Sequence, residues 1–311
     1  MRLSVTDLCN LRCRYCMPAE GICKLSHEDI LTEDEMILAV ETAASLGVRK
    51  LRITGGEPLV KKNILSICRR AAAVPGIEEL CLTTNATLLP SMAGELRKCG
   101  VERINISLDT LDPEKYSDMT RGGDLQDALR GIDAALEAGF RKVRINTVLI
   151  GGFNDEEIPA LAELTKRLPV DVRFIELMPM PGQNDFSETA YIPNSRVLEA
   201  LPKLQPAEGY TEEGKRSTAE LWQLPGALGK IGLISPVSRP FCEACNRIRL
   251  TADGKLKPCL HSAEEYPIKG LSPEEMREQF LRAIQNKPVG HDGLSRDEIS
   301  HSRRSMHAIG G

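Results

Sequence analysis

The chain has 311 residues, of which 41% are hydrophobic and 27% charged, and its formal net charge is -4. This composition supports a sizeable core and excludes a disordered or fibrous chain. The negative charge and the 4% aromatic content argue against nucleic acid as a partner. No apolar run approaches the roughly 18 residues of a membrane helix, and no signal-like segment opens the sequence, so no membrane association is expected. Ten cysteines then predict a reducing compartment, the cytoplasm, where thiolates are free to bind metal.

Residues 1–178 repeat one pattern, in which a short run rich in Val and Ile is followed by an amphipathic stretch of helical period. Such alternation predicts strands joined by helices, and therefore a parallel sheet. The expected strands are residues 2–6, 50–54, 79–84, 103–108, 142–149 and 171–177, and the expected helices are residues 32–46, 63–73, 90–99, 125–138 and 155–168. Because six such units are fewer than the eight of a closed barrel, we expect an α/β fold, a partial (βα)6 TIM-type barrel.

Local signals support the helix boundaries. Thr32 and Glu35 have the spacing of a capping box, which starts a helix. Gly47, Gly100 and Gly139 stand where C-terminal caps belong, because glycine adopts the left-handed conformation that ends many helices.

After residue 178 the pattern changes. Residues 179–188 form a loop rich in Pro and Gly, and residues 202–217 form a polar connection. Strand-like runs follow at residues 220–224 and 230–234, and a helix is expected at residues 273–285. We therefore divide the chain into a barrel, residues 1–178, and a C-terminal α+β region, residues 179–311.

Distinctive short segments follow the expected strands at their carboxyl ends. They are a cysteine-containing loop and residues 55–58, 83–85, 107–109 and 176–178. In parallel barrels the active residues gather at this rim. The sequence therefore predicts a functional site there.

Cys9, Cys13 and Cys16 form a C-x3-C-x2-C loop after the first expected strand. Three thiolates from one short loop suit a [4Fe–4S] cluster, in which three cysteines leave one iron open to an outside molecule. Zinc is the alternative, but structural zinc is four-coordinate and no fourth ligand is near, since His27 lies eleven residues further on. We therefore expect an open cluster at this loop.

A second group, Cys242, Cys245 and Cys259, lies more than two hundred residues later. On spacing alone, a Cys3His zinc site that includes His261 and a second iron–sulfur cluster both remain open. The other four cysteines are isolated, namely Cys23, Cys68, Cys81 and Cys99. We expect Cys68, Cys81 and Cys99 to be small buried residues and make no such prediction for Cys23.

The expected strands carry cations where apolar residues are usual, at Arg2, Lys50, Arg52, Arg144 and Arg173. A period of two places Lys50 and Arg52 on one face of their strand. For any one of these side chains, a solvated outward position or an ion pair is an equal alternative. Five of them in an acidic protein nevertheless predict a lumen that binds a triphosphate, because Arg and Lys bind phosphate oxygens.

Several longer strings point to a family. They are LSVTDLCNLRCRYCMP, RITGGEP, LTTN, NISLDTL, RFIELM and CEACNRIRLTADGKLKPCL, and the sequence ends in IGG. The C-x3-C-x2-C loop followed by GGEP one strand later resembles the radical S-adenosylmethionine (SAM) superfamily. Together, the strings resemble its GTP 3′,8-cyclase family over nearly the whole chain.

The resemblance implies roles for individual residues. It makes the second cysteine group another [4Fe–4S] cluster, whose open iron faces the guanine base. It places SAM contacts at Tyr15, Gly56, Ser107 and Met178. It places GTP contacts at Arg2, Arg52, Thr83, Arg144, Arg247 and Arg249, and we add the strand cations Lys50 and Arg173. The family pattern has a lysine at the position of Arg144. The arginine keeps the positive charge, but its side chain differs in reach. The expected catalytic residues are Arg2 and the C-terminal pair Gly310 and Gly311.

The implied activity is conversion of GTP to (8S)-3′,8-cyclo-7,8-dihydroguanosine 5′-triphosphate, the first step of molybdenum cofactor (molybdopterin) biosynthesis. In that reaction SAM is split into methionine and a 5′-deoxyadenosyl radical, which removes a hydrogen from C3′ of GTP, and C3′ then attacks C8. The implied cofactors are two [4Fe–4S] clusters and SAM. The implied partners are GTP, an electron donor and, downstream, cyclic pyranopterin monophosphate synthase, and the resemblance allows a homodimer.

Two rival functions remain open from the sequence. The nearest is another radical SAM enzyme with an auxiliary cluster, which acts on a peptide or a different small molecule. A zinc-binding interaction protein is the rival from another class.

Overall fold

The computed structural model describes residues 1–22, 25–26, 28–181, 190–207, 218–290 and 300–310. Its strands are β1 Arg2–Ser4, β2 Lys50–Thr54, β3 Glu79–Thr84, β4 Val101–Ser107, β5 Lys142–Leu149, β6 Val170–Glu176, β7 Gln205–Pro206, β8 Glu220–Gln223, β9 Ile231–Ile234, β10 Arg249–Leu250, β11 Lys255–Lys257 and β12 Tyr266–Pro267. Its α-helices are α1 Glu33–Ser45, α2 Ile64–Ala72, α3 Ala93–Lys98, α4 Pro113–Thr120, α5 Leu125–Glu137, α6 Ile158–Arg167, α7 Ser195–Ala200, α8 Pro273–Gln285 and α9 Met306–Ile309. None of these described helices is long and apolar enough to cross a membrane.

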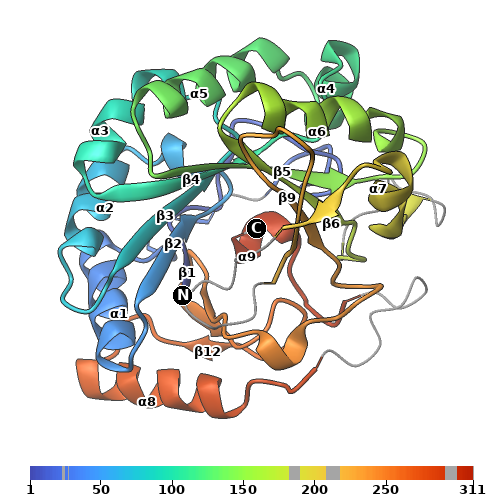
Figure 1. Ribbon diagram of the computed structural model, residues 1–311. Coiled ribbons are helices and arrows are strands. Elements are labelled where there is room, and N and C mark those ends of the chain that lie inside the picture. Colours follow the sequence, from blue (N-terminus) through green and yellow to red (C-terminus); the bar gives the residue numbers. More distant parts are fainter. Residues whose placement is uncertain (23–24, 27, 182–189, 208–217, 291–299, 311) are drawn as a thin grey trace.

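Among the described residues, the strands form one twelve-stranded sheet in the order β12-β11-β10-β1-β2-β3-β4-β5-β6-β9-β8-β7. Every pairing from β10 through β1 and β6 to β9 is parallel, whereas β11, β12, β8 and β7 are added antiparallel at the two ends. Viewed along its axis, the sheet curves around a lumen with helices on its outer side, and α9 lies near the centre of the ring (Figure 1). The predicted α/β fold with a parallel, barrel-like sheet is confirmed.

The helices begin and end as local chemistry predicts. The hydroxyl of Thr32 accepts a hydrogen bond from the amide of Glu35 at 3.2 Å, and the Glu35 carboxylate accepts one from the amide of Thr32 at 2.8 Å. This confirms the capping box at the start of α1. Gly47, Gly100 and Gly139 have φ values of +90°, +91° and +69°, so each is the left-handed residue that ends a helix.

Alternation along each strand separates the core from the lumen. Outward-pointing residues such as Leu51, Ile53 and Phe174 are 0% exposed and pack in the core beneath the helices. The alternate positions on the same strands hold polar or cationic residues such as Arg52 on β2 and Arg173 on β6. The apolar layer stabilises the barrel, and the inner face is left for polar chemistry.

The structure adds two features to the predicted barrel. Strands β9 and β10, which follow residue 178, pair in parallel with β6 and β1 and so continue the barrel sheet at both edges. The second added feature is helix α4, which the sequence pattern did not lead us to predict. Asp112 caps its first turn, and Pro113 stands at its first position. The predicted helix at residues 90–99 begins only at Ala93, after the 3-10 turn Leu89–Ser91.

Candidate functional site

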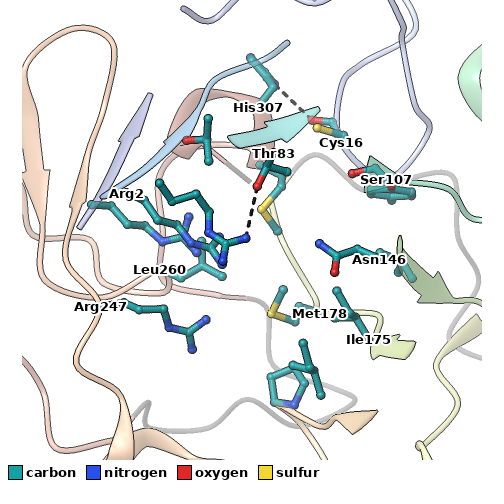
Figure 2. A pocket seen from close by; sticks show the side chains of 18 of the residues that line it. Arg2, Cys16, Thr83, Ser107, Asn146, Ile175, Met178, Arg247, Leu260 and His307 are labelled. Atoms are coloured by element: carbon teal, nitrogen blue, oxygen red, sulfur yellow. Dashed lines mark hydrogen bonds between the residues drawn. The ribbon is translucent and has the colours of Figure 1, made fainter. Parts of the chain in front are cut away.

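The carboxyl ends of the parallel strands open into a cavity of about 280 Å³ (Figure 2). Both cysteine groups line this cavity, together with side chains from the barrel strands and from α9. The predicted site residues that it brings together are Arg2, Cys9, Cys13, Tyr15, Cys16, Arg52, Gly56, Thr83, Ser107, Met178, Cys242, Cys245, Arg247, Arg249 and Cys259. Residues more than two hundred positions apart therefore face one space.

The first cysteine loop is shaped by its backbone. The amides of Cys16 and Met17 both donate to the carbonyl of Cys13, at 2.9 and 3.0 Å, which turns the chain sharply. From outside, the guanidinium of Arg121 donates to the carbonyls of Arg12 and Met17 at 2.7 and 2.8 Å. The loop is thus held open around three free thiols.

Burial and chemistry both suit these thiols to a metal cluster. Burial raises the pKa of Cys16 to about 12 and raises the pKa of Cys13 well above its ordinary value. Thiolates at such positions require a neighbouring positive charge, which bound iron supplies. No group of three or more Cys, His, Asp or Glu side chains among the described residues converges closely enough to hold a single metal ion. Three free thiols from one short loop match the three cysteine ligands of a [4Fe–4S] cluster with one open iron, so the loop fits that cluster.

The second cysteine group also lines the cavity. Cys242 opens the short 3-10 helix Cys242–Ala244, Cys245 directly follows it, and Cys259 follows β11. Burial acts to raise the pKa of Cys245, but the charge and hydrogen bonds of Arg247, together with the charge of Lys287, outweigh burial and lower that pKa. The Arg247 Nε donates to the Cys245 sulfur at 3.4 Å. His261 lines the cavity, and its Nδ1 lies 3.0 Å from the hydroxyl of Ser300.

Gly56 has a structural reason to be glycine. A Cβ built there would lie 2.3 Å from the carbonyl oxygen of Leu8, because the loop after β2 packs directly on the cysteine loop. The amides of Gly56 and Glu57 donate to the carbonyls of Thr6 and Leu8, each at 2.7 Å. The GGEP segment therefore holds the cysteine loop in place.

Glu57 is a site residue that the sequence reasoning did not single out. It is 1% exposed, and it accepts hydrogen bonds from the Thr84 hydroxyl at 2.8 Å and the Asn85 amide at 2.7 Å. Burial raises the pKa of Glu57 to about 7, while these donors oppose that shift. Its position directly after two glycines at a strand end was the available signal.

Four arginines gather at one side of the cavity. In the sheet register Arg2 lies between Arg52 on β2 and Arg249 on β10, and Arg247 is two residues from Arg249. Burial, with repulsion from Arg247, lowers the pKa of Arg249 to about 9. Burial, with repulsion from Arg103 and Arg144, lowers the pKa of Arg52 to about 10. Arg52 also donates to the Thr83 hydroxyl at 3.4 Å (Figure 2). So many buried cations favour a polyanionic ligand.

Comparisons with known proteins agree with this geometry. A sequence model of the Radical SAM superfamily matches residues 3–165, and one described as Molybdenum Cofactor Synthesis C matches residues 170–293. A GTP 3′,8-cyclase of Alkaliphilus oremlandii is 47% identical over 100% of this chain and 97% of its own length, and one of Peptoclostridium acidaminophilum is 47% identical over 100% and 95%. This chain belongs to the GTP 3′,8-cyclase family of radical SAM enzymes.

A solved structure shows the same fold at low identity. Streptococcus suis SuiB bound to S-adenosylmethionine matches 93% of this chain and 65% of its own, with a TM-score of 0.64 and 15% identity. Membership of the radical SAM superfamily confirms the predicted cofactors, SAM and iron–sulfur clusters. The assignment of individual residues to them stays a prediction.

Three predicted GTP contacts of this cyclase family member do not line the cavity itself. Lys50 forms an ion pair with Glu79. Arg144 Nε lies 3.4 Å from a carboxylate oxygen of Asp171. The pKa of Arg173 is lowered well below its ordinary value by burial, and then by repulsion from Arg144. These cations form a deeper layer of the lumen, and contact with a bound triphosphate stays a prediction for each of them.

Arg103 is a second site candidate that the sequence reasoning missed. It lies on β4 with a side chain 5% exposed, and its guanidinium is 2.8 Å from the Glu79 carboxylate. The charge of Arg103 lowers the pKa of both Arg52 and Arg173, so its side chain lies close to theirs. The strand Val101–Ser107 shows the same alternation as β2, and this was the signal that could have revealed Arg103.

The C-terminal segment enters the lumen. Gly310 has φ +76°, its carbonyl accepts from the Arg249 guanidinium at 2.6 Å, and a Cβ there would lie 2.4 Å from the Thr54 hydroxyl. Only glycine fits this position without displacing a neighbour. Gly311 lies outside the described residues, as do Cys23 and His27.

Proposed function

We propose that this enzyme converts GTP to (8S)-3′,8-cyclo-7,8-dihydroguanosine 5′-triphosphate, the first step of molybdenum cofactor biosynthesis. One observation carries the proposal: two three-cysteine groups and four arginines line a single cavity. A cluster at each cysteine group would place a redox centre on either side of a site built for a polyanion.

The first cysteine loop would hold the cluster that binds SAM, with Tyr15, Gly56, Ser107 and Met178 around the ligand. When bound, cluster and SAM supply the one-electron chemistry that removes a hydrogen from the substrate. The chain's own contribution is to exclude water and fix orientation. The hydroxyl of Tyr15, for example, donates to the Asp109 carboxylate at 2.8 Å, which ties the first cysteine loop to the segment after β4.

The arginines supply the affinity for GTP. Arg2, Arg52, Arg247 and Arg249 offer planar, fixed donors that suit phosphate and guanine oxygens. Arg247 also lies over the Phe241 ring, with 5.1 Å between the guanidinium carbon and the ring centroid, which fixes its direction. Ground-state repulsion among these cations is relieved when a polyanion binds.

The rival function within the superfamily is action on a peptide or on another small molecule. A peptide needs no such concentration of cations, whereas a triphosphate balances the charges of Arg2, Arg52, Arg247 and Arg249 where they line the cavity. The cation count therefore favours a nucleoside triphosphate.

We also propose partners and a cellular location for the enzyme. An electron donor must reduce the first cluster, and cyclic pyranopterin monophosphate synthase would take the product. We place the reaction in the cytoplasm, where cysteine clusters stay reduced, and a homodimer remains an expectation of the family resemblance.

The test is anaerobic reconstitution with iron and sulfide, followed by incubation with SAM, GTP and dithionite. Chromatography and mass spectrometry should then detect 5′-deoxyadenosine together with a cyclised product that has the same mass as GTP and separates from it by retention time. Cleavage of SAM without any modified GTP, in protein with both clusters filled, would refute the proposed substrate.

A further inference from the structure

The C-terminal segment, residues 305–310, connects the two halves of the cavity. His307 Nδ1 lies 3.2 Å from the carbonyl oxygen of Cys16 in the first cysteine loop (Figure 2). Three residues later, Gly310 accepts the hydrogen bond from Arg249. Ile309 between them is 1% exposed. The segment therefore touches the loop of one cysteine group and an arginine beside the other.

This segment cannot fix its own position. Its helix α9 spans only Met306–Ile309, and a four-residue helix is not stable alone. Its place in the lumen must therefore depend on contacts made by residues around it.

Arg304, directly before this segment, makes such contacts with two carboxylates. Its Nη1 and Nη2 lie 2.9 and 2.8 Å from the two oxygens of Asp253. Its Nε and Nη2 lie 2.6 and 2.7 Å from the two oxygens of Glu265. Each contact is a paired, charge-assisted bond, and the planar guanidinium is the group whose geometry permits two at once.

Both carboxylates belong to the part of the sheet that supports the second cysteine group. Asp253 lies in the turn between β10 and β11, and Glu265 directly precedes β12. The same hairpin carries Arg249 on β10 and leads into Cys259 after β11. Arg304 therefore fixes the C-terminal segment to the element whose arginine receives Gly310.

The anchor is charged at neutral pH. Burial acts to raise the pKa of Asp253 and of Glu265, but the hydrogen bonds and charge of Arg304 act against it, aided by the Thr251 hydroxyl at Asp253 and by Lys257 at Glu265. Together they hold both pKa values below their ordinary range. A carboxyl with a lowered folded pKa contributes its stabilisation above its unfolded pKa and loses it only as the pH falls through the folded value. The contact is thus complete at neutral pH.

We propose that Arg304 is a positioning residue that holds the C-terminal segment in the lumen and thereby couples SAM cleavage to GTP cyclisation. The coupling part of this inference rests on the proposed function, whereas the anchoring part does not. Without the anchor, residues 305–310 would leave the cavity for much of the time, and the reacting atoms would lose a wall that excludes water.

The experiment compares Arg304→Ala with Arg303→Ala, a matched control because Arg303 is the adjacent, exposed arginine. Hydrogen–deuterium exchange of the C-terminal peptide is measured first, in reconstituted protein without GTP. We expect exchange at residues 305–310 to be at least tenfold faster in Arg304→Ala and unchanged in the control. Arg304→Lys keeps the charge but not the paired geometry, and it should give an intermediate rate.

The second readout is the amount of cyclised product per SAM cleaved. In Arg304→Ala we expect parental iron content and continued SAM cleavage, with this ratio at least tenfold lower. If Arg304→Ala loses iron, the same two readouts are taken from the double variant Asp253→Asn/Arg304→Ala instead. This variant leaves no unpaired carboxylate at position 253. Parental exchange of the segment, or fast exchange with a parental ratio, overturns the inference. A parent protein that cleaves SAM but makes no cyclised product refutes the proposed function instead, and the exchange comparison still tests the anchor.

Discussion

Replacement of Gly56 by alanine tests whether the loop after β2 holds the cysteine loop. The new Cβ would lie 2.3 Å from the carbonyl oxygen of Leu8 and 2.6 Å from that of Asp7, both backbone atoms that no rotamer change can move. Reaching 3.0 Å from the first requires a shift of about 0.7 Å (3.0 − 2.3) between the two loops. Such a shift stretches the hydrogen bonds from the Gly56 and Glu57 amides, each 2.7 Å long, to roughly 3.4 Å and so weakens them, at up to about 1 kcal/mol each. The loop geometry that holds the first cluster should therefore lose up to about 2 kcal/mol, roughly 30-fold.

The assay is the release of iron to a chelator under anaerobic conditions. In Gly56→Ala, about half of the iron, that of the first cluster, should be released up to roughly 30-fold faster than in the parent, and SAM cleavage should fall with it. Gly94→Ala is the control, because a Cβ at that glycine meets no atom within 4 Å. Parental iron release and SAM cleavage in Gly56→Ala would refute the argument that this close approach positions the cysteine loop.

Three further predictions follow from the cavity. Reconstituted protein should contain about eight irons per chain, four per cluster. Cys245→Ala should keep about four irons, retain SAM cleavage and lose cyclisation. Stoichiometric zinc in a fully active protein would contradict this prediction. Arg52→Ala and Arg247→Ala should each weaken GTP binding in anaerobic calorimetry by roughly 1.5–3 kcal/mol and leave SAM binding nearly unchanged; parental GTP affinity in both would refute the phosphate argument. Gly310→Ala should keep both clusters but lower cyclised product at least tenfold, since its Cβ meets the Thr54 hydroxyl at 2.4 Å, and full cyclisation would show that the tail has no role.

Much of the site could be expected from the sequence because its chemistry is written in short, ordered motifs. Cys9, Cys13 and Cys16 are close in sequence, so their spacing alone implies a common ligand. The period of two along β2 was enough to place Lys50 and Arg52 on one face. What could not be expected was which cations face the cavity, since ion pairs with Glu79 and Asp171 depend on neighbouring strands.

The division between sequence and structure has a physical reason. Local patterns determined the alternating strands and helices and the capping of α1, because these depend on contacts within a few residues. The two-residue strand β10 carries too little pattern to be placed, and only the closure of the sheet decided that it pairs with β1 and brings Arg249 beside Arg2. The same holds for the C-terminal segment, whose course into the lumen is set by Arg304 and its two carboxylates, contacts between residues about 40 to 50 positions apart. Tertiary structure alone joined the two cysteine groups into one site.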